Sequence, residues 1–156
     1  PLGQKNAMDG NISLLRDFNF NRRSKLGNNF KAQFKASMDR ATGIVSVSVG
    51  AIDPVSELKK SPRNTHFRLR IIGIEADFAA GTSVSGMAES DLLSLRKMPL
   101  NSDEHSPFSL TVQLPARSTK PLLLVMALQY YRVRGANADP SLDSAYNALA
   151  IVDTNS

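Results

Sequence analysis

Few residues in this chain are of types that could carry out catalysis. His66 and His105 are the only histidines, and there is no cysteine. The stretch Gly81–Gly86 resembles the Gly-x-Ser-x-Gly turn of serine hydrolases, but its glycines are one residue too far apart, and no strand, sharp turn and helix surround it. His66 is expected beside Arg68 on the polar face of a strand, and His105 in an acidic loop. We therefore expect two surface histidines and no catalytic residue.

Carboxylates with the spacing of a metal site are also missing. Asp103, Glu104 and His105 are consecutive, and consecutive loop side chains cannot easily surround one ion. Asp139 and Asp143 lie in a later loop, without the repeated aspartates of a calcium-binding loop. The sequence thus predicts no metal and no cofactor. Carbohydrate binding by a loop remains an alternative, and in a chain without Trp its aromatic candidates are Tyr130, Tyr131 and Tyr146.

The charge distribution is the feature most open to a functional interpretation. Residues 1–75 contain 13 Lys and Arg against 6 Asp and Glu, whereas residues 76–156 contain 6 against 8. The positive charge is therefore local, on an arm that precedes the first strand and on the polar faces of two strands. The candidate basic surface consists of Arg22, Arg23, Lys25, Lys31, Lys35, Arg68 and Arg70.

A basic surface of this kind suits several partners. Phosphates, an anionic glycan or an acidic patch on another protein would all be attracted to it. Nucleic-acid binding usually adds stacking aromatic rings, but Phe30, Phe34 and Phe67 alternate toward the opposite, apolar side of their strands. We therefore favour a protein partner or a homo-oligomer in which the basic half of one copy meets the acidic half of another.

Alternation of apolar and polar residues dominates the chain and predicts β-strands. Strand 122–134 should be central in a sheet, because Leu122, Leu124 and Met126 give it one apolar face and Leu123 and Val125 give it another. We expect turns at residues 39–43 and 79–82 and loops at residues 99–107 and 135–143. Residues 53–65 are expected to form a crossover loop with one short helical turn. The expected strands are 30–38, 45–50, 65–74, 82–89, 108–114, 122–134 and 145–152, with a short strand or helical turn at 92–98.

About seven or eight strands and no long helical pattern predict an all-β fold. We expect an antiparallel two-sheet sandwich, immunoglobulin-like or of a related Greek-key order. Residues 1–7 begin with Pro-Leu-Gly and are interpreted as the remnant of an expression tag. Residues 8–26 are expected to form an N-terminal arm or edge segment, packed on its own domain or on a neighbour, and residues 27–153 the sandwich.

Four segments carry a resemblance to a known group of proteins. They are Thr65–Phe67, Glu75–Phe78, Ser118–Val125 and Ala145–Val152. They resemble an uncharacterised all-β domain family of Bacteroidota, over about residues 18–152. The resemblance implies a bacterial β-sandwich and brings no activity or site residue with it.

These observations predict a non-enzymatic structural or protein-binding module. It would self-assemble through the N-terminal arm and a contact between basic and acidic surfaces, and the alternative is a sandwich that binds polyanions such as nucleic acid or an anionic glycan. No signal peptide is visible, and the longest apolar run, residues 122–128, is too short for a membrane span. On this basis a cytoplasmic location is slightly favoured.

Overall fold

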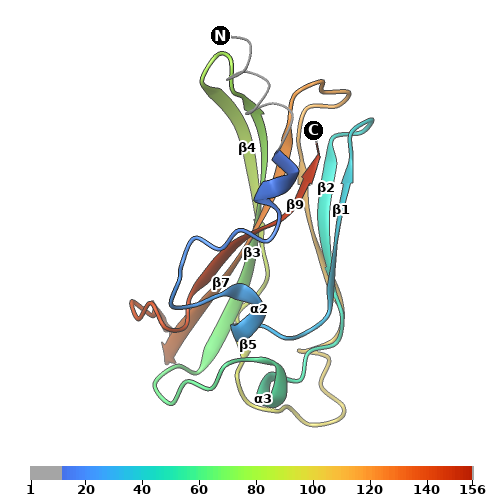
Figure 1. Cartoon of the computed structure of the whole chain (residues 1–156). Helices are drawn as coiled ribbons and strands as arrows, with labels where there is room; N and C mark the ends of the chain where they lie inside the picture. Colours follow the sequence, from blue (N-terminus) through green and yellow to red (C-terminus); the bar gives the residue numbers. More distant parts are fainter. Residues whose placement is uncertain (1–11, 156) are drawn as a thin grey trace.

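The computed structural model describes residues 12–155, which form two antiparallel sheets packed face to face (Figure 1). The smaller sheet has the order β1-β2-β6, and the larger has the path β4-β3-β7-β8, with β5 paired to β3 and β9 paired to β7. The strands are β1 (Phe34–Asp39), β2 (Ile44–Val49), β3 (His66–Asp77), β4 (Thr82–Glu89), β5 (Leu93–Ser94), β6 (Phe108–Gln113), β7 (Leu122–Arg134), β8 (Asn137–Pro140) and β9 (Ala148–Asn155). Short helical turns occur at η1 (Ile12–Leu15), α2 (Leu26–Asn29) and α3 (Pro54–Glu57).

The apolar core lies between the two sheets. Alternate residues of β3 point into it, so Phe67, Leu69 and Ile71 are fully buried while the residues between them face outward. Strand β7 is central, as predicted, because it pairs with β3 on one side and with β8 and β9 on the other. Its second apolar face, which includes Leu123 and Val125, forms a smaller cluster on the outside of the larger sheet.

The all-β sandwich is therefore confirmed, with nine strands in the described residues rather than seven or eight. The immunoglobulin-like strand order stays a prediction. In residues 53–65, the expected helical turn is α3, which begins after Asp53 because its side chain accepts a hydrogen bond from the N–H of Val55. The uncertain segment 92–98 contains the two-residue strand β5.

Several predicted boundaries are wrong. The first strand starts at Phe34 rather than Phe30, because Phe30 ends helix α2 and its backbone bridges to Leu58. Residues 135–143 are not a simple loop but contain β8, which turns back on β7. The last strand runs from Ala148 to Asn155, since residues 144–146 form a turn.

The structure describes only part of the two N-terminal segments of the predicted domain scheme. The proposed tag remnant, residues 1–7, lies outside the described residues, and the arm is described from Ile12 onward. None of the described helices has the length and apolar character needed to cross a membrane.

Candidate interaction surface

The seven cations of the predicted basic surface do not form one surface. Lys35 points away from the core on β1, the first strand of the smaller sheet. Arg68 and Arg70 point away from the core on β3, in the larger sheet. Because the core lies between the two sheets, these side chains face opposite sides of the molecule. Lys31 precedes β1 instead of belonging to it, and its backbone N–H donates to the carbonyl of Glu57.

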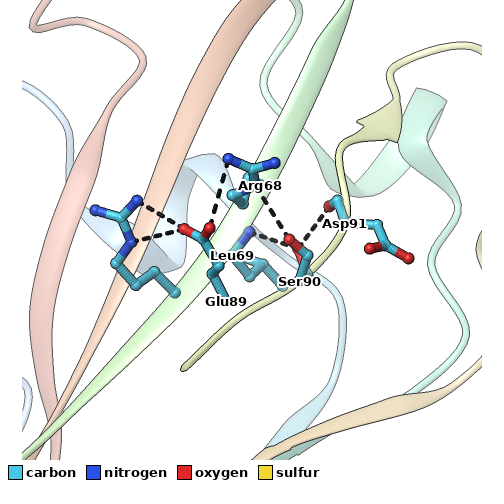
Figure 2. A network of polar contacts seen from close by, with 6 residues as sticks. Arg68, Leu69, Glu89, Ser90 and Asp91 are labelled. Atoms are coloured by element: carbon cyan, nitrogen blue, oxygen red, sulfur yellow. Dashed lines mark hydrogen bonds and ion pairs between the residues drawn. The ribbon is translucent and has the colours of Figure 1, made fainter. Parts of the chain in front are cut away.

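Arg68 and Arg70 are bound to a carboxylate of the neighbouring strand β4 (Figure 2). Arg70 donates to Glu89 Oε2 from Nη2 at 2.7 Å and from Nε at 3.2 Å. Nη1 of Arg68 lies 3.8 Å from Glu89 Oε1, its Nε donates to the carbonyl of Ser90, and its guanidinium lies over the Tyr131 ring. These two arginines therefore hold the β3–β4 edge together and offer little free charge to a partner.

The contacts with Arg68 and Arg70 shift the pKa of the Glu89 carboxyl away from its ordinary value. The hydrogen bond from Arg70 lowers the pKa of the Glu89 carboxyl, and the charges of both arginines act in the same direction. We expect carboxyl NMR to find its midpoint below the ordinary glutamate range, and Arg70→Met to raise it. The ion pair contributes stability above the unfolded-state pKa, and this contribution is lost as the pH falls through the lowered folded-state pKa. An unchanged midpoint in the Arg70→Met variant would show that the contact is absent in solution.

The five remaining cations are exposed and, within residues 12–155, have no ion-pair partner. Arg22, Arg23 and Lys25 belong to the arm, in the segment that leads into α2. The free positive charge of the predicted surface is thus concentrated on the arm and on the start of the smaller sheet.

The arm lies against the outer edge of β9 in the same chain (Figure 1, dark blue). Asn19 and Ala150 form an antiparallel bridge. Three main-chain hydrogen bonds surround it, from Asp17 N–H to the Ile151 carbonyl, from Ile151 N–H to the Phe18 carbonyl, and from Phe20 N–H to the Leu149 carbonyl. The arm thus binds main-chain groups at a strand edge that would otherwise be open to pairing with another chain.

Asparagine side chains fasten the arm to the loop that precedes β9. The Nδ2 of Asn21 donates to the carbonyls of Ser144 and Asn147 at 2.8 and 3.0 Å. The Nδ2 of Asn29, buried at the end of α2 just after the arm, lies within hydrogen-bond distance of the carbonyls of Ala145 and Tyr146 and of the hydroxyl of Ser24 in the arm. Both side chains bond to main-chain atoms, so these contacts depend on loop conformation more than on the side chains of the loop.

The arm leaves several of its apolar side chains in contact with solvent. Ile12 is buried, but Leu14, Phe18 and Phe20 are 79%, 50% and 54% exposed. The two phenylalanine rings pack edge to face, with centroids 5.1 Å apart, and cover each other only in part. Neighbouring exposed apolar side chains of this size are typical of a surface that contacts another protein.

One of the two histidines differs from what the sequence predicts. The side chain of His105 is only 10% exposed, and its Nε2 lies 2.8 Å from the carbonyl of Ser94, so the predicted surface histidine is wrong at this position. Its ring instead connects the long loop before β6 to β5. His66 is half-buried, with Nδ1 against the hydroxyl of Thr65. In the described residues, no three His, Asp or Glu side chains are arranged to hold a metal ion.

The tyrosines proposed for carbohydrate contact are largely inaccessible. Tyr130 is fully buried, its hydroxyl donates to the Lys59 carbonyl at 2.7 Å, and burial raises the pKa of that hydroxyl. Tyr131 is 8% exposed and lies beneath Arg68. Nζ of Lys59 lies 5.4 Å from the centroid of Tyr146. Tyr130 and Tyr131 are therefore structural, and only the partly buried Tyr146 is left for the carbohydrate alternative.

Comparison with known proteins adds no relative: no family model, curated protein or solved structure matches the chain. The resemblance to the Bacteroidota family accordingly stays a prediction.

Proposed function

We propose that this protein is a non-enzymatic, protein-binding module that associates with further copies of itself by exchanging its N-terminal arm. In the exchanged form, the arm of one copy would lie on β9 of another and make the bonds that it makes within one chain. Exchange of identical elements creates little new interface energy and needs no new complementary surface. Strand addition at a sheet edge is a general mode of protein recognition.

The observation that supports this proposal is the way in which the arm is held. Three of its hydrogen bonds to β9 are between main-chain atoms, and Arg16 adds a side-chain ion pair with Asp153. An arm from another copy would make the same contacts, because β9 is identical in every copy. Meanwhile Leu14, Phe18 and Phe20 are left partly or mostly exposed within the single chain. Bringing such side chains against a second copy removes apolar surface from water, which favours association.

The polyanion alternative is less well supported. Arg68 and Arg70 are occupied by Glu89, and they lie on the face opposite to Lys35. A strand of nucleic acid or glycan would therefore meet the arm and the smaller sheet, but not the whole set of predicted cations. This division of charge favours local contacts with a protein over one continuous polyanion track.

The test uses a reversible disulfide that fixes the arm on its own chain. The variant Asn19→Cys/Ala150→Cys places two thiols opposite each other in a chain that has no other cysteine. Oxidation in dilute solution closes the disulfide within one chain and fixes the arm. We expect light scattering to show that the mean mass of the reduced form rises more steeply with concentration than that of the oxidised form. Identical curves for the two forms would contradict arm exchange.

A further inference from the structure

A pocket of about 350 Å³ opens at the end of the sandwich that carries α3. Its apolar lining comes from Pro54, Val55, Pro62 and Leu95. Val55 is 52% exposed, so the pocket presents an apolar wall to solvent. A small, open apolar pocket of this type suits one protruding side chain of a partner.

The charged residues that line this pocket are all cations. They are Lys59, Lys60 and Arg96. Nζ of Lys59 donates to the carbonyl of Ala145, whereas Lys60 and Arg96 are exposed and have no ion pair within residues 12–155. An occupant should therefore combine an apolar side chain with nearby carboxylates.

The same chain displays a segment with these properties. Leu142 follows β8 and is 96% exposed, and the exposed residues Asp139 and Asp143 lie on either side of it. Neither carboxylate forms an ion pair with any residue of the described range. The segment 139–143 is thus an apolar projection between two negative charges, complementary in character to the pocket.

Projection and pocket belong to the same end of the molecule. Lys59, which lines the pocket, contacts the carbonyl of Ala145 and the ring of Tyr146, three and four residues after Leu142. In a twofold contact, residue i of one copy meets residue j of the other, and j meets i. A surface that carries a projection beside a matching pocket can therefore pair with itself, each copy inserting its leucine into the other.

We infer that this end of the sandwich is a twofold self-association surface, in which Leu142 of each copy occupies the pocket between Pro54 and Leu95 of the other. Asp139 and Asp143 then face Lys60 and Arg96 across the contact. The inference shares self-association with the proposed function but uses a different surface. Arm exchange and leucine insertion can therefore fail independently.

The oxidised Asn19→Cys/Ala150→Cys variant, the locked chain, has its arm fixed by a disulfide, so its sedimentation measures this contact without arm exchange. We expect the locked chain to form pairs, and Leu142→Asp to weaken pairing by at least about tenfold, because a leucine leaves an apolar pocket. Met87→Asp is the matched control, since Met87 is 56% exposed on β4 and gains the same charge elsewhere. A locked chain that stays monomeric at about 1 mM, or equal weakening by both substitutions, would overturn the inference.

Charge reversal tests the orientation of the contact. Lys60→Glu and Asp139→Lys should each weaken pairing, and the chain that carries both should recover it, because opposite charges again face each other. Both side chains are exposed, so their replacement is not expected to disturb folding. If the double variant pairs no more strongly than the single variants, Asp139 does not face Lys60 across the contact. Arm exchange in the unlocked chains is measured separately and does not depend on this result.

Discussion

Gly43→Ala should destabilise the protein by about 3 kcal/mol and lower its melting temperature by roughly 6–12 °C. Gly43 ends the turn between β1 and β2 with φ of 76°, a left-handed conformation that alanine adopts only with strain. A Cβ at this position would also collide with the carbonyl oxygen of Leu114 and lie 2.8 Å from that of Pro115. These are backbone atoms at the end of β6, and the Leu114 N–H bonds to the Gly43 carbonyl, so they cannot easily move away.

Gly81→Ala provides the matched control for this substitution. Gly81 has φ of 68°, but a Cβ there would have no atom within 4 Å. Its replacement should therefore cost only the conformational strain, about 1 kcal/mol. Circular dichroism melts of both variants separate the two effects. Equal losses of stability would show that the contact between the turn and the end of β6 is looser than described.

Asn29→Ala should destabilise the protein by about 2–3 kcal/mol, as measured by urea unfolding. The side chain of Asn29 is 3% exposed and donates to the carbonyls of Ala145 and Tyr146 at 3.1 and 3.0 Å. Without these donors, the partly buried carbonyl of Tyr146 loses its partner, and the carbonyl of Ala145 keeps only Nζ of Lys59. The arm is then attached to the loop before β9 only through Asn21. Hydrogen exchange at the Phe20 amide should accelerate as well, because this amide bonds to β9 beside that attachment.

Asn28→Ala is the control for that variant. Asn28 is the neighbouring residue of α2, is exposed, and changes helix propensity in the same way. It should leave the unfolding midpoint within about 0.5 kcal/mol of the unmodified chain. If the two alanine variants unfold at the same urea concentration, the buried asparagine does not anchor the arm.

Much of the sandwich could be predicted because strand alternation is a local pattern. Residues 122–128 are apolar on both faces, and this predicted correctly that β7 is central. The strand at residues 137–140 was missed, since Asn137–Pro140 has no apolar alternation and all four residues are exposed. Its pairing depends on the turn at Gly135, where φ is 58°, and on the adjacent end of β7.

The candidate site was less predictable because its contacts join distant parts of the chain. The sequence identified Arg68 and Arg70 as free cations, but their partner Glu89 lies on another strand and meets Arg70 only through the β3–β4 register. The arm is rich in asparagine, which marks Asn21 but not Asn29, and the partners of both side chains are carbonyl groups of residues 144–147. A carbonyl group is present at every position, so no residue type in the sequence marks it as a partner.

Mixing two single-cysteine chains tests arm exchange most directly. Asn19→Cys in one chain and Ala150→Cys in the other place the thiols on separate polypeptides, and residues 19 and 150 are opposite each other in the arm–β9 bridge. Because a disulfide forms only when the Cβ atoms approach to about 4 Å, an arm must lie on β9 of the other chain for the two to become linked. We predict a covalent heterodimer that accumulates with concentration. Yields no higher than those from mixing Asn19→Cys with Met87→Cys would contradict arm exchange.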